Sequence, residues 1–227
     1  MPLDFTPVAP VYDRLNDLIS FGLHRVWKRR LVRTLRRQAG NGRWLDMAAG
    51  TGDVAELMVK SGVSEVVAMD PCEPMVARGI VRTDSRISWR VANSESIPLA
   101  DGSIRAIACS FGVRNFTDRG QAFREWNRVL APGGICGVLE IHPPERGLFY
   151  GLFQIHWRWV VPLLGRLAGR GNAYDYLKSS VLGFVSPKTL AQEALASGLE
   201  PLGSSSLFGK GVVSLSLFRK HGGHEEN

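Results

Sequence analysis

Short apolar runs alternate with amphipathic stretches over most of this 227-residue chain. The runs are bounded by Gly, Pro, Asn or Asp, which is typical of buried parallel strands, while the stretches between them repeat their apolar residues at helical spacing. The pattern predicts strands at residues 44–47, 66–69, 87–91, 104–110 and 135–141. It predicts helices at residues 11–38, 53–60, 74–81 and 120–130, with a turn at residues 132–134. Strands that alternate with helices indicate an α/β fold with a parallel sheet.

The last third of the chain has a different pattern. A helix is predicted at residues 186–197, with Ser at its N-cap and Gly198 at its end. Two β-type runs follow at residues 202–208 and 212–219. The Gly-Lys-Gly sequence at residues 209–211 joins them and favours a hairpin.

A glycine turn follows the first predicted strand. The apolar run that contains Asp46 breaks into the small residues 48–52, and the next apolar run ends in Asp70. Strand, glycine turn, helix, strand and carboxylate form the half of a doubly wound domain that holds a nucleoside, with Asp70 placed to accept hydrogen bonds from two ribose hydroxyls. The alternative is an ordinary tight turn between a strand and a helix. Val54 and Ala55 stand where a dinucleotide site has its third glycine, and no Gly-Lys-Ser/Thr follows, so neither a dinucleotide motif nor a P-loop is present.

The charge is unevenly distributed. The chain has 28 Lys and Arg against 21 Asp and Glu, a net charge of +7. One N-terminal segment holds Arg25, Lys28, Arg29, Arg30, Arg33, Arg36 and Arg37. Such a patch attracts an anionic surface, either nucleic acid or the cytoplasmic leaflet of a membrane, and a solvated helix face is the alternative.

Composition and spacing limit the class of protein. A chain of this length that is 44% hydrophobic suits one well-cored domain, which we expect at residues 1–220, with a disordered tail at residues 221–227. Three scattered cysteines without a CxxC motif indicate a reduced, cytoplasmic protein, and residues 1–10 do not resemble a secretion signal. The longest apolar stretch, residues 147–167, contains too many polar residues to span a membrane. The sequence shows no carboxylate cluster of the magnesium-binding kind, so we expect no metal.

Longer motifs carry a family resemblance. The form Asp-x-small-x-Gly-x-Gly resembles the first motif of methyltransferases that use S-adenosylmethionine (SAM). Five further motifs resemble the C-methyltransferases of menaquinone and ubiquinone biosynthesis: YDRLNDLISFGLHRVWKRR (12–30), VANSESIPLADGS (91–103), SFGVRNFTD (110–118), RVLAPGG to LEIHPP (128–144) and YDYLKSSV (174–181). The first and third are the most specific, and the resemblance covers roughly residues 11–220.

The chain departs from the family pattern at four positions. Ala49 stands where the family commonly has Gly, and Lys178 and Val185 stand where it often has Pro. Ser216 lies near the position where the family usually carries a His. Ala49 adds a methyl group to the cofactor turn, and the other three bear on the substrate pocket.

The resemblance implies a class I SAM methyltransferase fold: a seven-stranded, Rossmann-like sheet that is mostly parallel, with one antiparallel terminal strand and helices on both faces. It further implies an N-terminal helical extension at residues 11–40 and an inserted lid helix region at residues 145–182. The implied activity is C-methylation of a reduced prenylated quinone, first of all demethylmenaquinol to menaquinol. The alternatives are a benzoquinol of ubiquinone biosynthesis, another small phenol, and a SAM-fold scaffold without catalysis.

The expected cofactor site lies at the carboxyl ends of the strands, where open α/β sheets bind ligands. Its residues, as the resemblance implies them, are Asp46, Gly50, Thr51, Gly52, Asp70, Asn93, Ser94 and Ser110. Asn93 and Ser94 can hydrogen-bond an adenine edge, and a helix cap is the alternative role for Ser94.

The expected catalytic residues are Arg114, Asn115 and Tyr12. A phenol with a pKa of about 10 costs about 4 kcal/mol to ionise at neutral pH, and a nearby cation lowers this cost. Arg114 would stabilise the phenolate, directly or through a water that takes the proton. Asn115 would orient the ring or the water, and Tyr12 would bond the second ring oxygen. The alternative for Arg114 is an ion pair with Asp118 or Glu140. The alternative for Tyr12 is a capping or core role.

Two histidines and one amphipathic segment complete the expectations. His24 and His142 are alternative bases, although a structural role is the commoner one for His24. Residues 146–170 mix aromatics with arginines, which fits either a helix at the membrane interface or a lid packed on the sheet. We therefore expect peripheral association with the inner, anionic face of the membrane, and either a homodimer or a complex of quinone-biosynthesis proteins. A nucleic-acid partner is not expected, because residues 110–113 lack the Asn/Asp-Pro-Pro-aromatic motif of enzymes that methylate base amines.

Overall fold

The computed structural model describes residues 17, 20–143, 151 and 178–222. Its strands are β1 (Arg43–Met47), β2 (Glu65–Asp70), β3 (Ile87–Val91), β4 (Ile104–Ser110), β5 (Leu130–Ile141), β6 (Leu199–Phe208) and β7 (Val213–Lys220). Its helices include α2 (Leu23–Ala39), α3 (Asp53–Lys60), α4 (Glu73–Arg82), α5 (Arg119–Val129) and α9 (Pro187–Ala196), with short 3-10 turns η1 (Val113–Asn115) and η3 (Gly209–Gly211).

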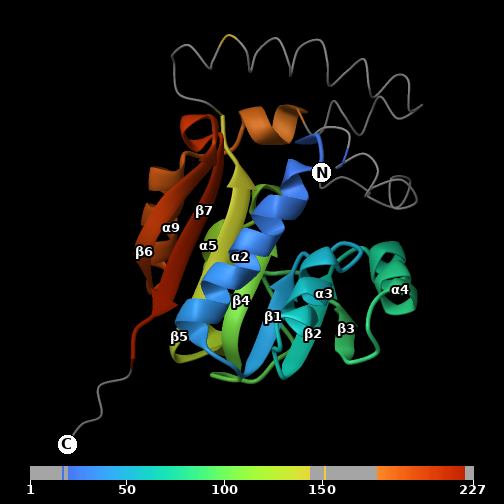
Figure 1. Cartoon of the computed structure of the whole chain (residues 1–227). Coiled ribbons are helices and arrows are strands. Elements are labelled where there is room, and N and C mark those ends of the chain that lie inside the picture. Colours follow the sequence, from blue (N-terminus) through green and yellow to red (C-terminus); the bar gives the residue numbers. More distant parts are fainter. Residues whose placement is uncertain (1–16, 18–19, 144–150, 152–177, 223–227) are drawn as a thin grey trace, which may run out of the picture.

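The seven strands form one sheet in the order β3-β2-β1-β4-β5-β7-β6 (Figure 1). All neighbours from β3 to β5 run parallel, and β7 is antiparallel to both β5 and β6. The predicted sheet and its one antiparallel strand are confirmed. Because β1, β2 and β4 are adjacent and parallel, their carboxyl ends meet at one edge, where the strand order reverses direction and α/β sheets bind ligands.

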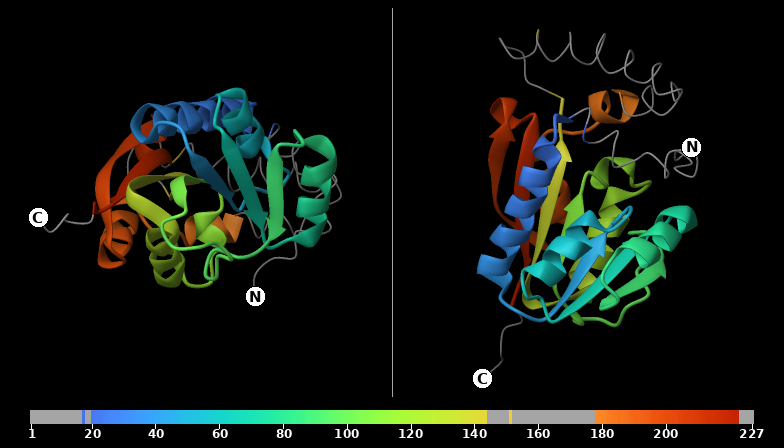
Figure 2. Two further views of the ribbon diagram at one scale, coloured as in Figure 1. Left: turned by 90° about the horizontal axis from the view of Figure 1, so that it is seen from below. Right: turned by 45° about the vertical axis from the view of Figure 1, so that its right-hand side comes forward.

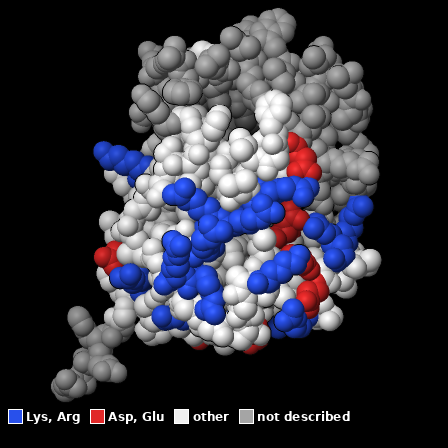
Figure 3. Space-filling model, in the orientation of Figure 1, with Lys and Arg blue, Asp and Glu red and all other residues white. Residues whose placement is uncertain are grey.

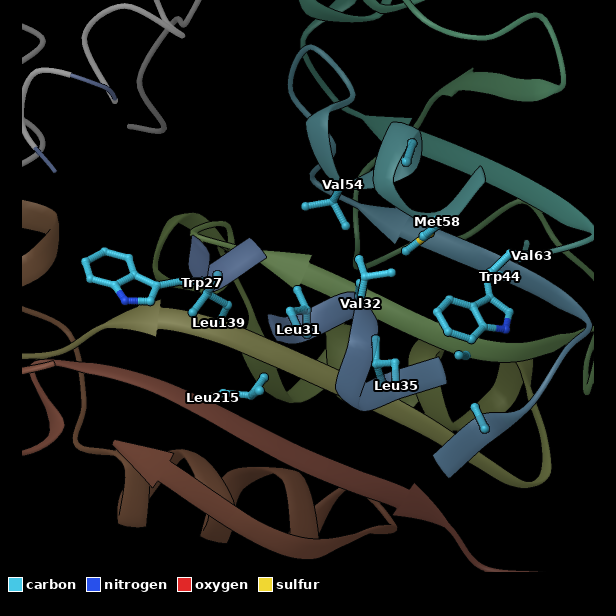
Figure 4. Packing of buried hydrophobic residues seen from close by; sticks show 14 of the residues in the cluster. Trp27, Leu31, Val32, Leu35, Trp44, Val54, Met58, Val63, Leu139 and Leu215 are labelled. Atoms are coloured by element: carbon cyan, nitrogen blue, oxygen red, sulfur yellow. The ribbon is translucent and has the colours of Figure 1, made fainter. Parts of the chain in front are cut away.

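Helices cover both faces of this sheet. Figure 2 shows α2 and α3 on one side and α5 and α9 on the other. The core under α2 and α3 is built from Leu31 and Leu35 of α2, Trp44 of β1 and Met58 of α3, all fully buried (Figure 4). The opposite core contains Phe123, Trp126, Leu190 and Phe218, with the Phe123 and Trp126 rings edge to face at 5.3 Å. Burial of each such side chain contributes about 1.5–3 kcal/mol before the entropy cost of ordering it.

The N-terminal helix is interrupted where the sequence pattern predicted a continuous helix over residues 11–38. Phe21 and Gly22 have φ values of +50° and +74°, and α2 begins only after them. Apolar spacing cannot reveal such a break, because it reports which side chains face the core and not the backbone conformation between them. Residues 1–16, 18 and 19 lie outside the described part of the chain.

The predicted turn at residues 132–134 is wrong as a separate element. β5 starts directly after α5, at Leu130, and runs through these residues to Ile141. A register shift opposite Ile104 and Ala106 and a φ of +68° at Gly133 accommodate the irregular start of the strand. Pro132 and the glycines therefore mark a bulged strand entry. In the part of the chain that the structure describes, no helix is both long and apolar enough to cross a membrane.

Candidate functional site

A cavity of about 210 Å³ opens at the carboxyl ends of β1, β2, β3 and β4. Five of the predicted cofactor residues line it: Gly50, Asp70, Asn93, Ser94 and Ser110. The structure thus brings together positions at the carboxyl ends of four strands, β1, β2, β3 and β4, as the parallel sheet predicted. Apolar side chains that the sequence did not single out enclose the same cavity, among them Met47, Met75, Phe111 and Phe116.

The glycine turn forms the floor of the cavity. Ala48, Gly50 and Gly52 all have positive φ values, of +54°, +57° and +93°. The turn is tied to the sheet because Ala49 N–H donates to the Met69 carbonyl at 2.9 Å. A Cβ on Gly52 would lie 2.7 Å from the Trp89 ring, so this position has no room for a side chain. The strained Ala48 is held by its surroundings, which is common where a backbone must approach a ligand.

Asp70 stands at the end of β2 with its carboxylate facing the turn. Its two oxygens accept separate backbone bonds, from Gly50 N at 2.8 Å and Cys72 N at 2.9 Å. Burial raises the pKa of Asp70, and the two N–H groups oppose this effect. A carboxylate has about four lone-pair positions, so both oxygens retain acceptor capacity for a pair of ligand hydroxyls.

Ser110 supplies a polar atom whose partner is missing. Its Oγ is buried in the lining of the cavity and has no hydrogen-bond partner among the described residues. A buried hydroxyl without a partner costs about 1–3 kcal/mol, so its position favours a polar ligand atom beside it. Together with Asp70, Asn93 and the glycine turn, it gives a donor and acceptor set that fits the nucleoside and amino-acid parts of SAM.

Three predicted cofactor residues do not line the cavity. Asp46 is buried, its Oδ2 accepts Ala55 N–H at 2.8 Å, and burial raises its pKa to about 8. Thr51 accepts a bond from Arg82 Nη1 at 2.6 Å, and Gly52 packs against the indole of β3. These three residues support the glycine turn on the side away from the cavity. Ser94 does line the cavity, but its Oγ also accepts Trp126 Nε1–H at 2.7 Å.

Asp53, which sequence reasoning did not select, joins three helices behind the glycine turn. Its carboxylate bonds Lys28 of α2 at 3.0 Å and Arg82 of α4 at 2.7 Å, and Arg82 also holds Thr51. Burial alone would raise the pKa of Asp53, but the two cations outweigh it and lower the pKa to about 2. The only sequence signal was an acid in the first turn of the helix that follows the glycines.

Arg114 lies on η1, beside the cavity but not in its lining. Its Nη1 donates to Glu140 Oε1 and to the Phe111 carbonyl, both at 2.6 Å. The side chains of Arg114 and Glu140 are 8% and 0% exposed, so the ion pair that the sequence left as an alternative exists and is buried. Arg114 Nε has no hydrogen-bond partner among the described residues. Asn115 lines the cavity, whereas Tyr12 lies outside the described residues.

Both candidate histidines are held in structural contacts. His142 is buried, with Nδ1 at 2.7 Å from the Val185 carbonyl and Nε2 at 2.8 Å from Ser214 Oγ. Burial lowers the pKa of His142, which favours the neutral ring. His24 Nδ1 lies 2.7 Å from Ser20 Oγ, and burial lowers its pKa as well. Neither histidine belongs to the lining of the cavity. No group of three or more metal-binding side chains occurs within residues 20–143 and 178–222.

Comparison with known proteins agrees with this geometry. The profile of the ubiE/COQ5 methyltransferase family matches residues 4–220. The ubiquinone/menaquinone biosynthesis C-methyltransferase UbiE of Rubrivivax gelatinosus is 43% identical over 86% of this chain and 77% of its own length. The demethylmenaquinone methyltransferase of Thermus thermophilus is 40% identical over 86% of this chain and 90% of its own.

A solved structure of low sequence identity has the same fold. The SAM-dependent methyltransferase of Thermotoga maritima, described as a possible histamine N-methyltransferase, superposes with a TM-score of 0.68 at 17% identity. The match covers 95% of this chain and 97% of the other. This likeness shows a class I SAM methyltransferase fold, and the sequence matches decide the family. The chain belongs to the ubiE/COQ5 methyltransferase family.

Proposed function

We propose that this protein transfers a methyl group from SAM to a ring carbon of a reduced prenylated quinone, converting demethylmenaquinol to menaquinol. The observation that carries the proposal is the buried arginine of η1 beside a cavity with nucleoside-binding groups. The names of the relatives support a quinone substrate, and the Thermus relative supports the naphthoquinol. A benzoquinol is the second candidate, because the Rubrivivax relative is named for both pathways.

The residues of the cavity would hold the cofactor, which supplies an electrophilic methyl group when bound. Asp70 would accept the ribose hydroxyls, and Asn93 and Ser110 would bond the remaining polar atoms. The apolar residues Met47, Met75 and Phe116 would exclude water. Because the methyl donor is already activated, the protein contributes mainly alignment and a dry site.

Arg114 would make the ring carbon nucleophilic. Loss of a hydroxyl proton raises the electron density of the ring, and at neutral pH this ionisation costs about 4 kcal/mol. Glu140 and the Phe111 carbonyl fix one nitrogen of the guanidinium, and the buried Nε, which has no partner among the described residues, would donate to a phenolate or to a water that reaches it. Asn115, on the same 3-10 turn, would orient the ring. A bonding role for Tyr12 stays a prediction.

The membrane and the oligomeric state are also part of the proposal. A quinol with a polyprenyl tail resides in the bilayer, so the enzyme would work in the cytoplasm at the inner face of the membrane. Residues 146–170, the segment on which the sequence analysis based this contact, lie almost entirely outside the described part of the chain. We also expect a homodimer or a complex with other quinone-biosynthesis proteins.

The test combines turnover with cofactor binding. Purified protein is incubated with methyl-labelled SAM and either demethylmenaquinol or the demethyl benzoquinol, and the label is followed into the lipid product. We expect Arg114→Ala to lower turnover by about a hundredfold or more, as loss of one stabilising donor does elsewhere, with unchanged SAM affinity by calorimetry. Arg124→Ala, at an exposed position of α5, is the control for loss of an arginine away from the cavity.

Two results would count against the proposal. Arg114 has no catalytic role if turnover of the alanine variant stays within about threefold of the parent. If the parent binds no SAM, the chain is a scaffold rather than an enzyme.

A further inference from the structure

A surface groove between α2 and α3, remote from the cofactor cavity, is lined by cations. Its lining includes Arg29, Arg33, Arg36, Arg37 and Lys60 and no acidic residue. Figure 3 shows Lys and Arg side chains running as a band across this face. Counted from Arg29, the other three arginines follow after four, seven and eight residues, which places all four on one side of the helix.

Most of this charge has no counter-ion among the residues that the structure describes. Arg36 Nε donates to the Ser61 carbonyl at 3.4 Å, and Lys60 pairs with Glu56 at 3.0 Å. Arg29, Arg33 and Arg37 are exposed and make no ion pair or hydrogen bond with the described residues. Arginines elsewhere on the protein do have acidic partners, for example Arg43, Arg82, Arg86, Arg119 and Arg128. Three unpaired guanidinium groups in one groove repel one another, and an external anion relieves the repulsion.

The chemistry of the groove favours phosphate groups. Guanidinium groups present a planar fork of N–H donors that matches two phosphate oxygens. The groove is open and shallow, and Val32 and Leu57 form its apolar floor between the cations. An open row of arginines suits several phosphate groups side by side better than one enclosed anion.

The other end of the same helix is apolar and exposed. Phe21 is 78% exposed, Leu23 39% and Val26 55%. The positive φ of Phe21, unusual for a bulky residue, belongs to the turn that precedes α2. This end of α2 lies toward the edge of the sheet at which the parallel strands end (Figure 1). Exposed apolar residues at one end of a helix and arginines along it are the two features of a surface that lies on lipid.

We infer that the outer face of α2 docks on an anionic phospholipid membrane. The groove arginines bind headgroup phosphates, and Phe21 and Val26 enter the boundary between headgroups and acyl chains. The inference rests on the proposed function only in the lipid nature of the substrate. Vesicle binding is therefore measured without quinol or SAM, so that failure of methyl transfer and failure of docking are told apart.

The test is flotation of the full chain with vesicles of phosphatidylcholine alone or mixed with phosphatidylglycerol. The double variant Arg33→Gln with Arg37→Gln should lose about fivefold in partitioning per arginine, or about 25-fold in all, on the anionic vesicles at low salt. The control removes the same charge elsewhere, by Arg78→Gln on α4 with Arg124→Gln on α5, and should change binding less than about twofold.

A second variant pair tests the apolar end of the helix. Phe21→Asn with Val26→Ser should weaken binding by about tenfold and leave its salt dependence unchanged, because no charge is lost. Asn suits the first position because it tolerates a positive φ. SAM affinity and melting temperature, measured for every variant, confirm that each one folds.

Four outcomes would overturn the inference. Equal binding to neutral and anionic vesicles would remove the role of phosphate. An equal loss in the control variant would show that net charge alone matters. Displacement by inorganic phosphate at matched ionic strength would assign the groove to a free anion. Binding to RNA that is tighter than to vesicles and depends on Arg33 and Arg37 would assign it to nucleic acid.

Discussion

Replacement of Asp53 by Asn removes the charge that joins α2, α3 and α4 behind the glycine turn. The substitution keeps the size of the side chain but leaves Lys28, which is only 8% exposed, without its counter-ion. Arg82 loses the same partner while it still holds Thr51. We expect the variant to fold, to be less stable and to have a looser cofactor turn.

The size of the effect follows from the pKa. The pKa of Asp53 falls from 3.8 to about 2 in the folded protein, and each unit is equivalent to about 1.4 kcal/mol, so the charged form contributes about 2 kcal/mol. Because the folded-state pKa is depressed, this stabilisation is present above pH 3.8 and is lost as the pH falls through about 2. The uncompensated ammonium of Lys28 adds to the loss at neutral pH.

The assay is urea unfolding of parent and variant over a series of pH values. Asp53→Asn should lower the free energy of unfolding by about 2 kcal/mol or more near neutral pH, and the difference should shrink as the pH falls below 4. Asp84→Asn is the matched control, and it should change the free energy of unfolding less than Asp53→Asn does. The pKa of Asp84 is also lowered to about 2, but its partner Arg86 is two residues away and remains close in the unfolded chain. The reasoning is refuted if Asp53→Asn stays within about 0.5 kcal/mol of the parent at neutral pH.

Three further substitutions test the site. Gly112→Ala places a Cβ 2.6 Å from that of Ala48, so we expect a loss of about 1–3 kcal/mol in unfolding free energy and at least a tenfold weaker SAM affinity by calorimetry; parent-like affinity would disprove contact between the two turns. Ser110→Ala removes a buried hydroxyl that has no partner within the described residues, so it should raise the melting temperature or leave it unchanged, and weaken SAM binding by about tenfold; a lower melting temperature with normal binding would contradict this. Glu140→Gln leaves Arg114 buried without a counter-charge, so stability should fall by about 3 kcal/mol and turnover should fall with unchanged SAM affinity; a fully active variant would remove Glu140 from the positioning of Arg114.

The strands and the position of the cofactor cavity could be predicted because both depend on patterns local in the sequence. The apolar runs that contain Trp44 and Ile107 identify buried strands, and the parallel order places Asp70 and Ser110 at one edge. The structure differs from the sequence-based prediction where the backbone conformation decides where an element begins or ends. The break at Phe21 and the bulged start of β5 need φ values that side-chain periodicity does not encode.

The partners of the site residues were less predictable. Thr51 carries the same hydroxyl whether it faces a ligand or Arg82, and only the fold places α4 behind the turn. Glu140 was one of two candidate partners for Arg114, and β5 brings it to η1 while Asp118 caps α5 instead. Such choices depend on contacts between segments far apart in the chain, which neither composition nor spacing specifies.

The position of β7 between β5 and β6 has a consequence for synthesis of the protein. Ile135 pairs with Arg219, so the sheet that supports the site gains its sixth and seventh members only when the last strand has left the ribosome. Until then β5 is an uncovered apolar edge, and contacts of this sequence separation form slowly. A stop codon shortly before Val213 should therefore produce an aggregating chain rather than a smaller working enzyme.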